Sequence, residues 1–269
     1  MNSLNIVMLD SEFRLFQKMI YDTAGINMTE AKKSLISSRL AKRVRELGLA
    51  SYAEYFDIVK NVNNGEQQIA IDLLTTNETS FFRESRHFDY LRDHVLPSFN
   101  TGAIRVWSAA SSSGEEAYTI SMMLAEHCPV KEWAVVGTDI STRIVKKARE
   151  AKYPMNIANS IPEKYLKKYC LKGVSSQYGA FLIAKELRSR VEFVHANLTS
   201  DLARLGSFDV IFLRNVLIYF DTATKKRVID NVCRQLKPGG FIMFGHSESV
   251  TGVTNYLTSV APSIYIKKF

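Results

Sequence analysis

The amino-acid sequence predicts an α/β protein in which a small N-terminal helical domain precedes a doubly wound, Rossmann-like sheet with an inserted small antiparallel β subdomain. Three observations predict this fold. Roughly the first eighty residues carry apolar side chains at helical spacing. From Ile104 onward, short apolar strands alternate with helical segments, which is typical of a parallel sheet covered by helices. Between about Tyr165 and Arg190, two apolar pieces flank a Gly/Ser-containing stretch, as in a hairpin with a longer loop.

Four short amphipathic helices are predicted in the N-terminal part, each with a recognisable start or stop. Ser11 is placed to cap the first, whose apolar face ends near Gly25. Ser51 and Glu54 have the spacing of a capping box and begin the third. Thr29 begins the second helix and the Asn64-Gly65 turn precedes the fourth, so these helices cover about 30–47 and 66–74.

The alternating part predicts a series of strands separated by helices. The strands are Ile104–Ala109, Trp133–Gly137, Val191–His195, Phe208–Leu213, Phe241–Gly245 and Ser263–Lys267. The helices cover about Glu115–Cys128, Arg143–Ala151 and Thr222–Gln235. This order implies a helical domain over 1–76, a linker over 77–98 and a sheet domain over 99–269, with the β insertion at about 165–190.

Composition narrows the class of protein. Hydrophobic residues make up 46% and charged residues 23% of the 269 residues, as in soluble globular proteins. Charges interrupt every apolar run before it reaches membrane-spanning length, and no export signal is evident. Cys128, Cys170 and Cys233 fit neither a disulfide framework nor a zinc spacing, so we expect a cytoplasmic protein. The net charge of +8 permits either an acidic protein surface or a nucleic acid as partner.

The stretch Phe208–Asp221, FDVIFLRNVLIYFD, is the strongest candidate for an active-site wall. Its first half is a continuous apolar run, which predicts a strand buried on both faces. Arg214 and Asn215 follow at the carboxyl end of that strand, where α/β sheets bind their ligands. Because a guanidinium and an amide are costly to bury without partners, their position favours a functional role over a surface turn.

Two further loops predict a nucleoside site without provision for phosphates. The first, Ser108–Glu116, has small residues but lacks both GxGxxG and the phosphate-loop lysine. Its two glutamates would repel a phosphate, although a capped helix start explains the loop equally well. The second follows a strand at Asp139, where such sheets hold a ribose diol, although Asp139 or Ser141 would also serve as a helix cap. S-adenosylmethionine has a ribose and no phosphate, so it is the expected cofactor.

Five segments of the chain form a recognisable series. They are LLTTNETSFFRE (73–84), RVWSAASSSGEEAYTISMMLAE (105–126), GTDIS (137–141), FDVIFLRNVLIYFD (208–221) and LKPGGFIMFGHSES (236–249). In this order and over nearly the whole chain, they resemble the CheR-type chemotaxis receptor methyltransferases. The resemblance implies a methyltransferase sheet and an enzyme that moves a methyl group from S-adenosylmethionine to glutamate side chains of bacterial chemoreceptors, leaving S-adenosylhomocysteine.

The resemblance also implies roles for individual residues. Arg214 and Tyr219 match the catalytic wall, with Arg214 orienting the substrate carboxylate. Arg83 is expected at the carboxylate of the cofactor, and Glu115 at its ammonium group. The residues that match cofactor contacts are Asn77, Thr79, Arg83, Glu115, Asp139 (ribose), Asn197 and Leu198 (adenine), Arg214 and Asn215.

The partners follow from the same resemblance. A basic helix face that includes Arg39, Lys42 and Arg45 matches the positions that dock on the receptor, although such a face is more often simply solvated. The β insertion is compatible with capture of a receptor C-terminal pentapeptide. His246 is interpreted as structural, because an ionised carboxylate needs no general base. We expect a monomer that needs no metal and inserts in no membrane.

Two other functions stay open on the sequence alone. A nucleic-acid methyltransferase would suit the basic C-terminal part, but basic and aromatic residues are not interleaved there as base stacking requires. The asparagine-proline-proline-aromatic motif of amino methylation is also missing. A non-catalytic module that binds S-adenosylmethionine and signals through its helices is the other alternative. Against that alternative, the chain keeps the residues expected to be needed for catalysis: Arg83, Asp139, Arg214 and Tyr219.

Overall fold

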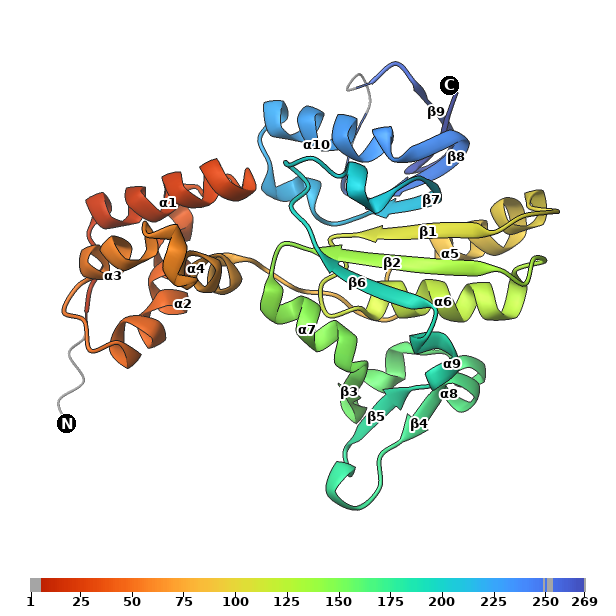
Figure 1. The fold of residues 1–269 in the computed structure, drawn as a ribbon, viewed down its shortest axis with the longest axis horizontal. Helices are drawn as coiled ribbons and strands as arrows, with labels where there is room; N and C mark the ends of the chain where they lie inside the picture. The colour runs from red at the N-terminus through yellow and green to blue at the C-terminus, as the bar shows by residue number, and fades with distance from the viewer. Residues whose placement is uncertain (1–5, 249, 251–253, 269) are drawn as a thin grey trace.

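The computed structural model describes residues 6–248, 250 and 254–268, so the extreme ends of the predicted first and last domains lie outside it. A bundle of four helices stands beside an α/β domain, and the segment 75–85 crosses between them (Figure 1). This arrangement confirms the predicted fold class. None of the described helices combines the length and the apolarity that a membrane span requires.

The N-terminal bundle is held by one shared apolar core. Phe16, Leu40 and Tyr55 come from three different helices and are completely buried there. Burying side chains of this size contributes about 1.5–3 kcal/mol each. The helices are α1 (Asp10–Ala24), α2 (Lys33–Glu46), α3 (Tyr52–Val59) and α4 (Glu66–Leu74).

The helix starts partly follow the predicted caps. Ser51 accepts a hydrogen bond from the backbone N–H of Glu54 at 3.1 Å, which confirms the cap of α3. The prediction for Ser11 is wrong, because α1 begins at Asp10 and the Glu12 carboxylate accepts from the N–H of Leu9 at 2.7 Å. The second helix also begins later than predicted, since a single 3₁₀ turn (Glu30–Lys32) precedes α2.

The main sheet has seven strands in the order β6-β2-β1-β7-β8-β10-β9. The first five in this order are parallel, whereas β10 runs antiparallel to both of its neighbours, β8 and β9. The strands are β1 (Ile104–Ala109), β2 (Trp133–Asp139), β6 (Val191–His195), β7 (Phe208–Leu213), β8 (Leu236–Phe244), β9 (Leu257–Ala261) and β10 (Ile264–Lys267). The main covering helices are α6 (Glu115–His127), α7 (Thr142–Glu150) and α10 (Thr222–Arg234).

Strand β7 shows that both faces of the sheet are covered. Val210 and Phe212 point into the core shared with α6, whereas Ile211 and Leu213 point into the core shared with α10. All four side chains are completely buried. The continuous apolar run therefore has the doubly covered environment that the sequence predicted.

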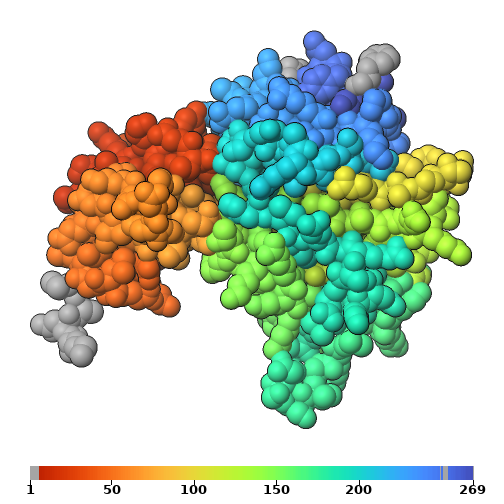
Figure 2. Space-filling view, in the orientation of Figure 1, coloured from red at the N-terminus to blue at the C-terminus, as the bar shows by residue number. Residues whose placement is uncertain are grey.

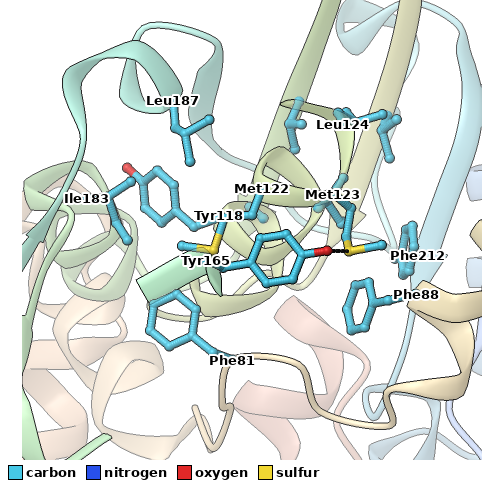
Figure 3. Close-up of a cluster of buried hydrophobic side chains, with 14 of the residues drawn as sticks. Phe81, Phe88, Tyr118, Met122, Met123, Leu124, Tyr165, Ile183, Leu187 and Phe212 are labelled. Atoms are coloured by element: carbon cyan, nitrogen blue, oxygen red, sulfur yellow. Dashed lines mark hydrogen bonds between the residues drawn. The ribbon is translucent and has the colours of Figure 1, made fainter. Parts of the chain in front are cut away.

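The segment predicted as a linker, 77–98, becomes helical in its second half. Helix α5 (Arg86–Tyr90) continues into a π-helical turn (Leu91–Val95) and a short 3₁₀ turn (Leu96–Ser98). Phe88 of α5 stacks on Phe212, with ring centroids 5.7 Å apart (Figure 3). The second half of the segment is therefore part of the core of the sheet domain.

The inserted subdomain is larger than predicted. It contains a three-stranded antiparallel sheet in the order β3-β5-β4, and it projects away from the main sheet (Figure 2). The predicted start at about 165 misses β3, because a three-residue strand has no periodicity of its own. Its central Tyr153 is nevertheless buried and pairs with Phe181. The elements are β3 (Lys152–Pro154), α8 (Glu163–Tyr169), β4 (Cys170–Lys172), β5 (Ala180–Ile183) and α9 (Lys185–Arg188).

The C-terminal strands also differ from the prediction. Strand β8 begins at Leu236, five residues before the predicted start at Phe241. A register shift opposite Phe208 accommodates these extra residues. Strand β9 was not predicted, whereas β10 lies within the predicted tail strand 263–267.

Candidate active site

A cavity of about 190 Å³ lies at the carboxyl ends of the central strands and against the helical bundle. Both domains and the connecting segment 75–83 contribute to its walls. Of the sequence-predicted cofactor and catalytic residues, all but Glu115 line it: Asn77, Thr79, Arg83, Asp139, Asn197, Leu198, Arg214, Asn215 and Tyr219. Residues far apart in the sequence therefore converge on one cavity.

Asp139 ends β2 at the bottom of this cavity. Its two carboxylate oxygens accept hydrogen bonds from the backbone N–H groups of Ser112 at 3.0 Å and Ser141 at 2.9 Å. Burial raises the pKa of Asp139 to about 6. The cap of α7 comes from Ser141 instead, whose hydroxyl accepts from the N–H of Ile144. The helix-cap interpretation of Asp139 is therefore not needed.

The loop between β1 and α6 is tightly wound beside Asp139. Ala110, Ser112 and Gly114 have positive φ angles of 62°, 50° and 96°. Tyr153 of the inserted subdomain donates a hydrogen bond to the backbone oxygen of Ser113 at 2.7 Å. A Cβ at Gly137 would lie 2.6 Å from the Phe193 ring, so no larger residue fits behind the loop. The inserted subdomain thus supports one wall of the cavity.

The two glutamates that begin α6 have different environments. Glu115 accepts a hydrogen bond from the Ser113 hydroxyl at 2.7 Å and does not line the cavity. Glu116 lines the cavity, accepts from the Ser108 hydroxyl at 2.7 Å and lies 2.8 Å from Nη1 of Arg214. Burial raises the pKa of both carboxyl groups. The sequence showed the pair of glutamates but did not show which of them faces the cavity.

Arg214 follows β7 and is held between two carboxylates. Its Nη1 donates to Glu116, and its Nη2 donates to Glu84 at 3.0 Å and to the backbone oxygen of Arg83 at 2.5 Å. The side chain is 1% exposed, and its guanidinium lies 5.5 Å from the centre of the Phe88 ring. A buried cation needs such compensation, because removing an unpaired charge from water costs several kcal/mol or more.

Glu84 and Glu248 are structural supports that the sequence interpretation did not single out. Burial alone would raise the pKa of Glu84, but hydrogen bonds from Asn215 and Arg214 lower it overall. The Nδ2 of Asn215 donates to Glu84 at 3.1 Å. Glu248 accepts from the backbone N–H groups of Asn215 at 2.8 Å and Leu217 at 2.7 Å. These bonds fix the left-handed backbone of Asn215, whose φ is 57°.

Two of the predicted site residues also join the two domains. Asn197 donates through Nδ2 to the backbone oxygen of Thr23 in α1 at 2.6 Å, and its Oδ1 accepts from the N–H of Thr199 at 3.0 Å. Tyr219 is half-buried on a 3₁₀ turn, and its backbone oxygen accepts from the N–H of Asn27 at 2.8 Å. The helical bundle therefore closes one side of the cavity.

The predicted docking residues do not form a uniform set. Arg39 lines the cavity and donates to the backbone oxygens of Leu74 at 2.8 Å and Thr75 at 3.1 Å. It therefore fixes the chain that leaves α4. Lys42 and Arg45 are exposed on the same helix, and the nearest carboxylate to Lys42 is that of Glu46 at 3.7 Å.

Two family models match this chain. One described as "CheR methyltransferase, SAM binding domain" matches residues 77–266, and one described as "CheR methyltransferase, all-alpha domain" matches residues 11–75. Together they cover the main sheet domain and the helical bundle.

Individual relatives agree with these matches. The chain is 36% identical over 264 residues to a chemotaxis protein methyltransferase of Escherichia coli strain K12, covering 97% of this chain and 92% of the relative. It is 37% identical over 261 residues to chemotaxis protein methyltransferase 2 of Pseudomonas aeruginosa, covering 94% and 92%. Among solved structures, the glycopeptide N-methyltransferase MtfA complexed with sinefungin covers 71% of this chain and 59% of that chain, at 15% identity and a TM-score of 0.39. That structural likeness is too distant to add to the argument.

Proposed function

The chain belongs to the CheR methyltransferase family, and from this premise we propose that it transfers the methyl group of S-adenosylmethionine to glutamate carboxylates of bacterial chemoreceptors. The products are glutamate methyl esters and S-adenosylhomocysteine. The observation that carries the proposal is one cavity that holds both Asp139 and Arg214 at the carboxyl ends of parallel strands.

The lining of the cavity fits a nucleoside cofactor without phosphates. Asp139 would accept hydrogen bonds from a ribose diol, and Asn197 with Leu198 would contact the adenine. Arg83 would pair with the carboxylate of the cofactor, because a guanidinium matches that group bidentately. Asn77, Thr79 and Asn215 are proposed as further contacts. For the ammonium group the resemblance favours Glu115, whereas the cavity lining favours Glu116.

When bound, S-adenosylmethionine supplies an electrophilic methyl group on a sulfonium and leaves as a neutral thioether. The substrate glutamate is already ionised at neutral pH, so the chain needs to supply no base and no metal. We propose that Arg214 orients this carboxylate and that Tyr219 forms the opposite wall. Glu84 and Glu116 hold the guanidinium in place, so catalysis depends mainly on positioning.

The receptor is proposed to dock at two places. The exposed cations of α2, Lys42 and Arg45, would meet an acidic receptor surface, with Arg39 at the edge of the cavity. The edge strand β4 and the loop after it expose Leu171, Val174 and Tyr178, whose exposed fractions are 55%, 72% and 83%. An extended receptor C-terminal pentapeptide would pair with such an edge by strand addition. The enzyme is proposed to act as a cytoplasmic monomer without a nucleic-acid partner.

Methyl transfer from tritiated S-adenosylmethionine tests the proposal. Receptor-containing membranes and total RNA are offered in parallel, and the labelled product is treated with base. We expect label in the membrane protein and its release as methanol, because carboxyl methyl esters hydrolyse in base. Label in RNA, or base-stable label in protein, would contradict the proposal. Cofactor binding without transfer to either substrate would favour the non-catalytic module.

A further inference from the structure

Three side chains behind Arg214 bring metal-ligating atoms together. Glu84, His87 and His246 each offer one ligand atom, and these atoms lie within 4.8 Å of one another. Nδ1 of His87 is 3.5 Å from Oε2 of Glu84, and the two imidazole rings are 4.8 Å apart. Two ligand atoms bound at about 2.1 Å to a tetrahedral zinc ion lie about 3.4 Å apart, so the first pair is already at ligand spacing.

His87 is an unusual buried histidine. It is 1% exposed, and neither ring nitrogen has a hydrogen-bond partner among the described residues. Buried polar groups are rarely left unpaired, so an unpartnered imidazole needs an explanation. An imidazole that makes no hydrogen bond within the protein has a ring nitrogen available to a metal.

The cluster can be reached without passing through the proposed cofactor cavity. His87 and His246 line a second cavity together with Tyr90 and the turn between β9 and β10, and it shares no lining residue with the first. His246 is exposed and Glu84 is partly accessible, so an ion can enter from solvent.

We propose that Glu84, His87 and His246 bind a zinc ion, with water as the fourth ligand. Two imidazoles and one carboxylate form a donor set that suits zinc, a metal of borderline softness, better than magnesium or calcium. The connection to the active site is Glu84, because its Oε2 is also the partner of Arg214. A zinc ion on Oε2 withdraws that oxygen from the guanidinium and adds a dication beside it.

Zinc is therefore an inhibitor that acts through the position of Arg214. This consequence rests on the proposed function, whereas the binding of zinc does not. Occupied enzyme would turn over more slowly in proportion to the bound fraction, and a chelator would restore the rate. The zinc-binding and turnover measurements are made separately, so a failure of the methyltransferase proposal leaves the metal-binding result readable.

The binding test uses untagged protein freed of metal by a chelator. Cys128 and Cys170 are replaced by Ser throughout, because both are partly exposed thiols and thiolates are ligands that zinc favours. Calorimetry with zinc and the visible absorption of cobalt measure affinity, stoichiometry and coordination. We expect one tightly bound ion per chain with a tetrahedral cobalt spectrum. His246→Ala should weaken binding by about tenfold or more, since losing even a supporting residue costs that much.

His94→Ala is the matched control, because His94 is also exposed and lies outside the cluster. It should leave the affinity unchanged. The proposed site would be overturned if zinc bound equally well to His246→Ala and to the protein with all its histidines intact. The absence of stoichiometric zinc binding would overturn it as well. Stoichiometric zinc with an undiminished rate of methyl transfer would overturn the inhibitory role.

Discussion

At the scale of single residues, the active site is organised around one buried cation. Arg214 has carboxylates on two sides, and those carboxylates come from segments about 100 and 130 residues earlier in the chain. Neither partner carries a special sequence signal. Glu116 is one of two adjacent glutamates, and Glu84 is the last residue of a motif in which Asn77, Thr79 and Arg83 are proposed as cofactor contacts.

The pair Glu115 and Glu116 offers a direct test of this arrangement. Glu116→Gln removes one charge beside Arg214 while keeping the shape, so the guanidinium is held less firmly. We expect kcat at saturating cofactor to fall by up to about 100-fold, because misplacing the proposed catalytic guanidinium carries that cost. Glu115→Gln, at the neighbouring glutamate whose carboxylate pairs with Ser113, serves as the control, with kcat at saturating cofactor nearly unchanged. Steady-state kinetics checks both variants, and equal losses of kcat would contradict the assignment.

The raised pKa of Asp139 predicts that cofactor binding depends on pH. Its pKa of about 6 lies above the ordinary value of 3.8, so the carboxylate gains a proton as the pH falls through about 6. A protonated Asp139 is a poorer acceptor for a ribose diol, so the Kd for S-adenosylmethionine should rise several-fold between about pH 7 and pH 5. Asp139→Asn should bind weakly at both pH values. A wild-type Kd that is constant over this range would contradict the proposed ribose contact.

The raised pKa of Asp139 has the opposite effect on folding stability, which is greater at low pH. Because the folded-state value exceeds the unfolded one, the folded protein binds the proton more tightly. This tighter proton binding contributes fully to the free energy of unfolding below about pH 4, and the contribution is lost as the pH rises through 6. Asp139 therefore costs stability at neutral pH, where its charge serves the site.

At the scale of elements, α2 combines two different tasks. Its residue Arg39 holds the end of α4, whereas Lys42 and Arg45 are exposed to solvent. The sequence interpretation grouped all three as docking cations, because spacing on a helix cannot show which side chain meets the body of the protein.

Charge reversal on α2 separates these tasks. Lys42→Glu with Arg45→Glu should raise the KM for receptor by about tenfold at low salt, since long-range attraction to an acidic surface is lost there. Cofactor affinity should stay constant, because neither side chain lines the cavity. Lys18→Glu on α1, exposed on a different helix, is the control. Receptor kinetics measured at low and high salt check the result, and an unchanged KM at low salt would remove α2 from docking.

The sequence predicts long apolar strands better than short ones. Ile104–Ala109 and Phe208–Leu213 have the bounds that the apolar runs indicated, because a strand covered on both faces consists mostly of apolar residues. Strand β3 was missed, since its three residues depend on pairing with β5 rather than on their own pattern. Glu84, His87 and Glu248 were missed for a related reason: their partners are distant in the sequence and appear only when the chain folds.

At the scale of the whole molecule, the cavity exists because the helical bundle sits against the sheet domain. Gly25 lies at this junction with a φ of 71°, and a Cβ there would be 2.6 Å from Thr224 and 2.9 Å from Thr199. Asp72 of α4 adds a second junction, accepting from the backbone N–H of Thr142 at 3.0 Å at the start of α7. These contacts fix how the bundle closes the cavity.

Gly25→Ala tests the importance of this junction. The added methyl group should separate the domains and weaken S-adenosylmethionine binding by about tenfold, while the strained φ costs about 1–2 kcal/mol of stability. Gly65→Ala is the matched control, because Gly65 has a φ of 74° but nothing within 4 Å of an added Cβ. The Gly65→Ala variant should lose a similar amount of stability and keep its affinity for S-adenosylmethionine. Calorimetry and urea unfolding measure the two quantities, and equal affinities would contradict the role of the junction.

The segment that crosses between the domains is fixed at both ends. Arg39 holds residues 74–76, and Arg214 holds the backbone of Arg83, while residues 75–80 lie along the wall of the cavity. We expect a molecule bound against this segment to dissociate faster when one of these attachments is weakened. Substituting Arg39 should therefore shorten its residence time even where the equilibrium affinity changes little. On this view the rate of product release depends on the helical bundle as well as on the sheet domain.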